Sequence, residues 1–381
     1  MKLSGDRIVT THVGSLPRPE ALREQLMARE GGETIDTDAF ESEIAEAVDA
    51  VVRRQVGLGI DVVSDGEMSK ISYATYVKDR YDGFGGEGKY RAAKDLLDYR
   101  EFGRHLVKIG GTVPTVSGPV CQAPITLRDG EPLRRDLANF QAAITAHPPG
   151  EAFMNAASPG VVSVFLGNEY YPSQQAYLEA LAVVLGAEYK AIVDAGFLLQ
   201  IDAPDLAMGR HLVHGDATVE AFREVAALHI EVLNTATADI PPEKMRLHLC
   251  WGNYEGPHHH DVPLADIIDI VLRARPMAIS VEASNPRHAH EWEVFQEVPL
   301  PDDKVLLPGV VDSTSNFIEH PRLVAQRLRN YADVVGRERV IASTDCGFAT
   351  FAGYPNVFPE IAWAKLESLV AGAEIASKSL W

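Results

Sequence analysis

The segment MRLHLCWGN, residues 245–253, places a histidine and a cysteine two positions apart, at His248 and Cys250. Both end an apolar run that is typical of a buried strand, and strand residues two positions apart point to the same side. Imidazole and thiolate are ligands that Zn2+ takes in proteins, so the pair can be half of a metal site. The alternative is core filling, since free cysteines are commonly buried as small hydrophobic residues.

Two further candidate ligands end other apolar runs, Glu282 in SVEAS and Cys346 in STDCG. With His248 and Cys250 they make two thiolates, one imidazole and one carboxylate, a set that suits Zn2+. Two thiolates donate more charge than the ligands of a hydrolytic zinc, so this zinc should activate water poorly and hold a third thiolate well. A substrate thiol with a free pKa of about 8.5 would bind as a thiolate and stay nucleophilic. The residues therefore predict thiol alkylation, with Glu282 loosening as the substrate sulfur arrives.

Such a site needs a fold that brings the ends of several strands together. Apolar runs alternate with longer helical stretches along the chain, which predicts parallel strands joined by helical crossovers. The expected strands are Arg7–Gly14, Gly59–Asp65, one in Thr112–Pro119 or in Phe153–Ala157, Phe197–Asp202, Met245–Cys250, Ala278–Ala283, Lys304–Asp312 and Arg339–Cys346. The expected helices include Phe40–Leu58, Ser173–Ala195, Thr218–Thr237, Arg322–Val335 and Pro359–Ser377. About eight such units predict an α/β fold, a (β/α)8 TIM barrel, and no GxGxxG motif supports a doubly wound sheet instead.

We expect one zinc-dependent barrel domain over residues 1–381, with an insertion after the second strand. Residues 83–150 are long for a single unit and rich in glycine and charge, so we interpret them as an excursion or lid above the barrel mouth. Active sites of such barrels lie at the carboxyl ends of the strands. The polar residues at those ends, besides the four candidate ligands, are Asp65, Glu67, Asp202, Asp312 and Asp345.

Composition argues against several classes of partner. The net charge of −19 disfavours nucleic acid and anionic membranes, and no apolar run approaches the length of a membrane span. The first residues lack the apolar core of a signal peptide, and three cysteines make disulfides improbable, so we expect a cytoplasmic protein. Cys121, in GPVCQAP, has no ligand-type neighbours and is interpreted as inert. A homo-oligomer is compatible with all of this.

The chain resembles the catalytic, C-terminal barrel of cobalamin-independent methionine synthase. The matching pieces run in family order from His12 to Gly347: HVGSLPRP, SDGE, LQIDAPDL, HLCWGN, SVEAS, GVVD and STDCG. The resemblance implies a UROD/methionine-synthase-like zinc barrel that transfers a methyl group from a folate to homocysteine. It implies zinc on His248, Cys250, Glu282 and Cys346. It also implies that Gly14, Ser15, Glu67 and Asp202 hold the amino-acid part of homocysteine, and two acids do suit an ammonium group.

Four departures from the family pattern concern length and the methyl donor. Full-length members carry two barrels, whereas this chain has the length of one. The residues after Asp312 are Ser-Thr-Ser, without the family's proton-donating histidine, and the folate-stacking tryptophan has no counterpart except the nearby Tyr170 and Tyr171. FATFAG replaces the usual basic residues after the last cysteine motif. Thiol activation is therefore expected, while the folate donor is not assured.

The run His258–His260 is an open question of its own. One of these histidines can replace the missing proton donor, so we count Asp312, His258, His259 and His260 as catalytic candidates. A plain surface loop is the alternative. A second metal is a further one, although three adjacent residues do not easily face one ion.

Single-barrel relatives include epoxyalkane:coenzyme M transferases, in which zinc activates another thiol. A sulfonate thiol needs cationic partners, and the candidates are Lys70, Lys78, Arg80, Lys89 and Arg91, each of which also suits a solvated surface. The main hypothesis is a zinc-dependent transferase that moves a methyl or alkyl group from a donor to a small thiol, either homocysteine or coenzyme M. A non-catalytic zinc- or thiol-binding barrel is the alternative of another class, and a zinc hydrolase is disfavoured by the two sulfur ligands.

Overall fold

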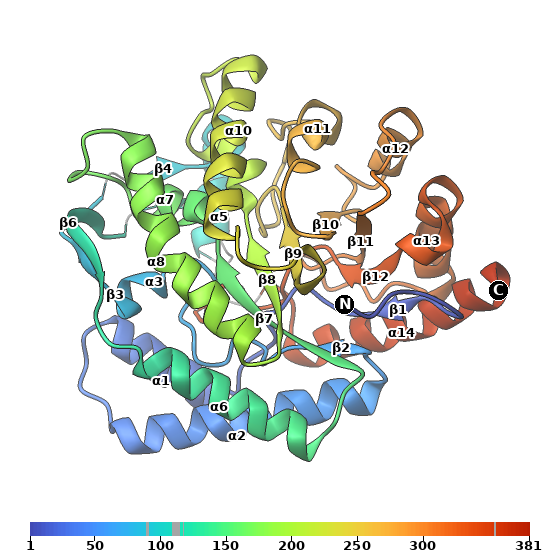
Figure 1. The fold of residues 1–381 in the computed structure, drawn as a ribbon, viewed down its shortest axis with the longest axis horizontal. Coiled ribbons are helices and arrows are strands. Elements are labelled where there is room, and N and C mark those ends of the chain that lie inside the picture. Colours follow the sequence, from blue (N-terminus) through green and yellow to red (C-terminus); the bar gives the residue numbers. More distant parts are fainter. Residues whose placement is uncertain (89–90, 109–114, 117, 354–355) are drawn as a thin grey trace.

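The computed structural model describes residues 1–88, 91–108, 115–116, 118–353 and 356–381. Eight strands lie side by side at the centre, all parallel, and helices surround them (Figure 1). The ring of strands closes where the amide of Asp61 donates to the carbonyl of Thr10, at 3.1 Å. The predicted (β/α)8 barrel is confirmed.

The barrel strands follow the sheet order β1-β12-β11-β10-β9-β8-β7-β2, in which chain neighbours are also sheet neighbours from β7 onward. Their bounds are β1 Val9–Thr10, β2 Val62–Val63, β7 Glu151–Ala157, β8 Leu198–Asp202, β9 Met245–His248, β10 Ala278–Glu282, β11 Val305–Val311 and β12 Ile341–Thr344. The third barrel strand along the chain is β7, which corresponds to the predicted alternative Phe153–Ala157. Residues 115–116 instead pair with 91–92 in a separate antiparallel sheet, and residues 112–114 lie outside the described part.

The helices outside the barrel alternate with these strands. Their bounds are α1 Glu20–Glu30, α2 Thr37–Leu58, α6 Glu131–Ala146, α8 Gln174–Asp194, α10 Val219–Ala236, α11 Ile268–Val271, α12 Val294–Glu297, α13 Pro321–Val335 and α14 Pro359–Leu380. Capping side chains define several starts: Asp36 accepts from two amides at the start of α2, and Ser173 and Thr218 cap α8 and α10. None of the helices in the described part of the chain has the length and apolar character needed to cross a lipid bilayer.

The remaining elements lie near the barrel mouth or between β2 and β7. Their bounds are α3 Val77–Arg80, β3 Tyr81–Gly85, β4 Arg91–Ala92, α4 Lys94–Asp98, α5 Arg100–Lys108, β5 Thr115–Val116, β6 Val120–Leu127, α7 Pro159–Phe165 and α9 Gly209–Leu212. Strand β3 pairs with β6 in a two-stranded antiparallel sheet, so the chain leaves the barrel after α3 and returns after β6. Helix α6 then packs on α2 outside the barrel (Figure 1).

The barrel interior has an apolar floor beneath a polar layer. Val9, Val62, Phe153, Leu198, Ala278, Val305, Leu307 and Ile341 form the floor. Two residues further along three of these strands lie Asn155, Gln200 and Ser280, and all three are buried. Because side chains alternate along a strand, the residues two positions further point inward again. This alternation places Asp202 and Glu282 at the mouth, level with or just above His248.

A buried ion pair fixes the start of the segment that leaves the barrel. Arg80 donates through Nη1 to Glu188 Oε1 at 2.7 Å and pairs through Nη2 with Asp136. The hydroxyl of Tyr76 also donates to Glu188 Oε1, at 2.7 Å. Arg80, predicted as a candidate sulfonate ligand, therefore joins α3 to helices α6 and α8.

Replacing Arg80 with alanine should leave two buried carboxylates without a cation. We expect Arg80→Ala to lower the free energy of unfolding by about 3–5 kcal/mol, measured by urea denaturation. The control is Arg128→Ala, because Arg128, directly after β6, pairs with the exposed Asp82 of β3 at 2.8 Å. Its loss should cost less than about 1 kcal/mol. Equal losses in the two variants would contradict the structural role of Arg80.

Candidate active site

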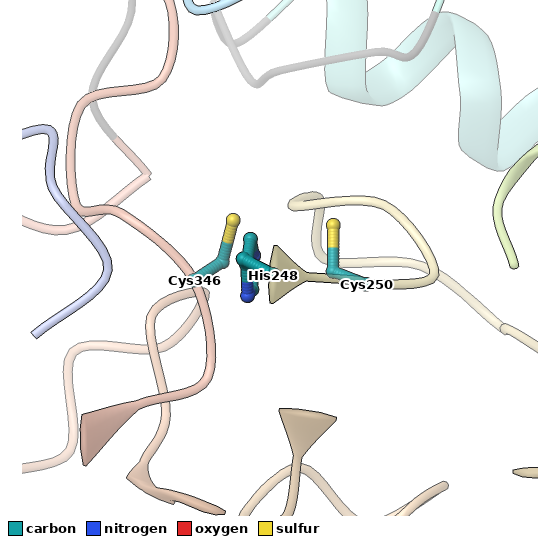
Figure 2. Close-up of side chains that lie close together, drawn as sticks. All are labelled: His248, Cys250 and Cys346. Atoms are coloured by element: carbon teal, nitrogen blue, oxygen red, sulfur yellow. The ribbon is translucent and has the colours of Figure 1, made fainter. Parts of the chain in front are cut away.

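Three of the four predicted ligands lie together at the mouth of the barrel. Ligand atoms of His248, Cys250 and Cys346 all lie within 4.8 Å of one another, and the three residues are buried. Figure 2 shows their side chains, with both sulfur atoms directed to the same side. His248 is the last residue of β9, whereas Cys250 and Cys346 each lie two residues beyond a strand end, on β9 and β12.

His248 has a hydrogen-bond partner at one ring nitrogen and none at the other among the described residues. Its Nδ1 lies 3.3 Å from Ser280 Oγ on the neighbouring strand. Its Nε2 is buried and has no hydrogen-bond partner in the described part of the chain. A buried polar atom without a partner is costly, so Nε2 is oriented to bind a ligand rather than the protein. The contact of the other nitrogen orients the ring, as outer contacts do for metal-binding histidines.

The two cysteine sulfurs influence each other's ionisation. A hydrogen bond between the Cys346 and Cys250 thiols lowers the pKa of Cys250 well below its ordinary value, against the opposing effect of burial. One of the two sulfurs is therefore disposed to ionise. Cys121, the third cysteine, is buried on β6 and contacts the carbonyl of Ala123, away from this group.

Glu282 lies on the adjacent strand but outside the group of three. Its Oε1 accepts from the backbone amide of Trp251 at 2.9 Å, and its Oε2 is hydrogen-bonded to the side chain of Asn285. Burial raises the pKa of Glu282 well above its ordinary value, and the nearby Cys250 raises it further. The carboxylate is thus near the sulfurs while bonded to the loops after β9 and β10.

An inner cavity adjoins the three ligand residues, and Ser15, Glu67 and Asp202 line it. Asp202 accepts from Asn155 and Gln200, at 2.9 and 2.8 Å. Glu67 Oε2 is buried without a partner among the described residues, and its backbone is strained, with a φ of 57°. Burial raises the pKa of Glu67 to about 7. Two acids, one of them unpaired, therefore face the same buried space.

Gly14 acts through its backbone beside this cavity. Its φ of 145° is rare for residues with a side chain, and an added Cβ would come within 2.3 Å of Asn155 Oδ1. Its carbonyl accepts from Ser64 Oγ at 3.1 Å. The backbone at Gly14 thereby places Ser15 in the cavity wall. The carbonyl of Ser15 accepts from the amide of Phe348, which links it to the loop after β12.

The four catalytic candidates lie apart from the group of three. Asp312 accepts from the amides of Thr314 and Ser315, so it holds the turn after β11. His258 bonds through Nδ1 to Asp261 and through Nε2 to the carbonyl of Tyr254, at 2.8 and 3.0 Å.

His259 and His260 both contact Asp98 at the rim. Asp312 and His258 line an outer cavity between the loops after β9 and β11, next to the inner one. None of the four candidates lines the inner cavity next to the two sulfurs.

The candidate sulfonate ligands are engaged elsewhere or lie outside the described residues. Lys70 donates to the carbonyl of Asn155 at 2.7 Å, and Lys78 pairs with Glu30 at 2.8 Å. Arg80 is in the ion pair given above, and Arg91 is exposed on β4. Lys89 lies outside the described residues. No lysine or arginine in the described ranges lines the inner cavity.

Sequence reasoning missed the aromatic wall of the inner cavity. Tyr73, Phe165 and Phe351 line it and contact one another edge to face or at a tilt, with ring centroids 5.9–6.2 Å apart. They come from the loops after β2 and β12 and from helix α7. The available signal was an aromatic residue shortly after a strand end, as in SYATY and FATFAG.

A second missed feature is a buried carboxylate that serves the loop carrying Cys250. Asp261 contacts His211, His258 and His288, at 3.1, 2.8 and 2.9 Å. His288 in turn contacts Glu291 at 2.8 Å and stacks on Trp251, with the ring centroids 3.8 Å apart. Because the amide of Trp251 holds Glu282, this network positions the carboxylate next to the sulfurs.

The Asp261 network should make stability depend on pH. Burial lowers the pKa of His288, but Asp261 and Glu291 outweigh it and raise the pKa to about 9, from 6.5. The folded protein therefore holds a proton that the unfolded chain releases above about pH 6.5. Below that pH the contribution is complete, and it is lost as the pH rises through about 9.

We expect the free energy of unfolding to fall by up to about 3 kcal/mol between about pH 6 and pH 9.5, relative to His288→Asn. Urea denaturation at a series of pH values measures this difference. The other groups that face the network, His211 and His258, are common to both proteins. A difference that does not change with pH would contradict the assignment.

Comparison with known proteins identifies the family of this chain and supports its fold. The family model described as cobalamin-independent synthase, catalytic domain, matches residues 8–89 and 168–368. A methionine synthase of Sulfolobus acidocaldarius is 26% identical over 374 residues, covering 97% of this chain and 93% of the relative. One of Thermococcus kodakarensis is 25% identical over 382 residues, covering 97% and 94%. These relatives thus have about the length of this chain.

Solved structures show the same fold. The structure of a B12-independent methionine synthase from Shewanella sp. W3-18-1, in complex with selenomethionine, has a TM-score of 0.76 at 20% identity and covers 98% of this chain and 99% of that one. A putative vitamin-B12 independent methionine synthase from Listeria monocytogenes has a TM-score of 0.67 at 16% identity, covering 100% and 99%. The predicted family and its transferase class are confirmed: the chain belongs to the family of cobalamin-independent synthase catalytic domains.

Proposed function

We propose that this protein transfers a methyl group from a donor to the thiol of homocysteine, with zinc bound at the barrel mouth. Family membership and the methionine synthases that cover nearly the whole chain support the reaction. The observation that carries the zinc is the convergence of His248, Cys250 and Cys346 within 4.8 Å. The three free cysteines also suit a reducing compartment such as the cytoplasm.

The residues present fit a zinc ion. Two sulfurs and an imidazole are a donor set of structural and catalytic zinc sites, and the unpartnered Nε2 of His248 supplies the imidazole lone pair. Glu282 is the fourth ligand of the proposal. In the structure its oxygens bond to Trp251 and Asn285. A carboxylate that has other partners nearby can give up its place to an arriving substrate sulfur.

When bound, zinc would supply a Lewis acid that keeps the substrate thiol deprotonated at neutral pH. The protein holds the rest of the substrate: Glu67 and Asp202 receive the ammonium group, and the Gly14–Ser15 backbone lies beside them. Tyr73, Phe165 and Phe351 exclude water from the sulfur. The sulfur attacks the methyl carbon, the new sulfur–carbon bond forms, and the bond from carbon to the donor breaks with its electron pair leaving on the donor.

Removing one sulfur ligand tests the site. Cys250→Ser should lose the bound zinc and reduce homocysteine methylation at least about a hundredfold, since a hydroxyl is a much weaker zinc ligand than a thiolate. Metal content measured by mass spectrometry and product formation with a methyl-donor panel check this. Cys121→Ser is the matched control, because it removes a buried thiol elsewhere and should keep both properties. Full zinc and activity in Cys250→Ser would refute the proposal.

The acid pair distinguishes homocysteine from thiols without an ammonium group. Glu67→Gln should raise the apparent Kd of homocysteine by about tenfold or more, because a charge-assisted hydrogen bond is lost. The affinity for coenzyme M should not change. Glu255→Gln is the control, since Glu255 lines only the outer cavity. Calorimetric titration of both thiols gives the values. Tighter binding of coenzyme M than of homocysteine by the unmodified protein would identify another substrate.

A further inference from the structure

Three side chains that the proposed reaction does not use meet at the rim of the barrel. Nε2 of His259 lies 3.0 Å from Asp98 Oδ2, and Nε2 of His260 lies 2.6 Å from the same oxygen. The ligand atoms of these three residues lie within 4.8 Å of one another, as those of the cysteine-containing group do. Each imidazole nitrogen offers a lone pair once it is unprotonated.

We propose that Asp98, His259 and His260 form a second metal site, which takes a borderline divalent cation such as Zn2+. Two imidazoles and a carboxylate are a donor set that zinc uses in proteins. The side chains are 31–48% exposed, so an ion can enter from solvent and keep water in its remaining positions. This inference does not depend on the proposed reaction.

The loop conformation explains how two adjacent histidines face one carboxylate. His258 has a φ of 53°, and both of its ring nitrogens are bonded on the inner side, to Asp261 and to the carbonyl of Tyr254. The next two residues therefore turn outward together, and the rings of His259 and His260 lie with centroids 4.2 Å apart. Of the three adjacent histidines, His258 therefore points inward, and His259 and His260 point outward. Only the two outward histidines are needed as ligands of the ion.

The carboxylate is brought to this position by a second, buried contact of the same helix. Asp95 Oδ2 accepts from the hydroxyl of Tyr254 at 2.6 Å and from the amide of His258 at 2.9 Å. Asp95 and Asp98 are three residues apart on α4 and so share a face of the helix. Docking of Asp95 on the loop therefore aligns Asp98 with the two histidines before any ion binds.

Electrostatics agrees with a cation at this place. The hydrogen bond from His260, followed by that from His259, lowers the pKa of Asp98 below its ordinary value, so the carboxylate is ionised at neutral pH. A bound cation would replace the protons that the imidazoles now direct at this oxygen. It would also join α4 to the loop that follows Cys250, and so restrain the segment that leaves the barrel.

Metal titration of the chelator-treated protein tests the second site. We expect the unmodified protein to bind two equivalents of Zn2+, and Asp98→Asn and His260→Ala to bind one. The matched control is His290→Ala, which removes another exposed histidine and should still bind two equivalents. These are surface positions, and an unchanged thermal midpoint of the metal-free variants shows that each folds.

Cobalt(II) identifies which site each equivalent occupies. Sulfur-to-cobalt charge-transfer absorption arises only from the cysteine-containing group, so the equivalent lost in Asp98→Asn must be the one without that absorption. Loss of the charge-transfer band instead would show that the variant had damaged the cysteine site. The second site would be overturned by a single equivalent in the unmodified protein that carries the charge-transfer band, or by Asp98→Asn binding as many equivalents as the unmodified protein.

Discussion

The closed ring of parallel strands makes every second strand residue face an interior without water, and the rest of the molecule follows from this constraint. Polar groups that point inward need protein partners there. Arg246 is the extreme case: it donates to Thr11 Oγ1 and to the carbonyl of His12, and its guanidinium lies over the ring of Phe153, 4.0 Å from the centroid. Burial lowers its pKa to about 9. This hydrogen-bonded polar layer lies directly beneath the candidate active site and supports it.

Above this polar layer, the inward-facing residues at the strand ends form the candidate active site. The loops that follow the strands hold these residues in place. Asp345 accepts from the amides of Ala283, Ser284 and Asn285, so it ties the end of β12 to the end of β10. Asn253 joins the loop after β9 to the carbonyl of Gly347 at 2.8 Å. The ligand-bearing strands are therefore linked to one another above the barrel, and a change in one loop reaches the others.

The segment from His248 to His260 contributes side chains to two separate groups at the barrel rim. His248 and Cys250 point into the barrel because they keep the strand alternation, while His259 and His260 point outward because His258 ends the loop in a left-handed conformation. Asp95 accepts from the amide of His258, and Asp261 contacts the ring of the same residue. The loop is thus fixed between the barrel and α4, and its two ends present different donor sets.

The sequence by itself determined the barrel and the set of metal-type side chains, because strand periodicity and chain order decide which residues reach the carboxyl ends of parallel strands. It also pointed to Glu67 and Asp202 through the strand ends and the family resemblance. Tertiary structure alone decided that Glu282 bonds to Trp251 and Asn285 beside the group of three. It alone showed that Asp261 contacts three histidines. It also showed that Tyr73, Phe165 and Phe351 form one wall of the inner cavity. These contacts join segments far apart in the chain, and no local pattern encodes the distance between them.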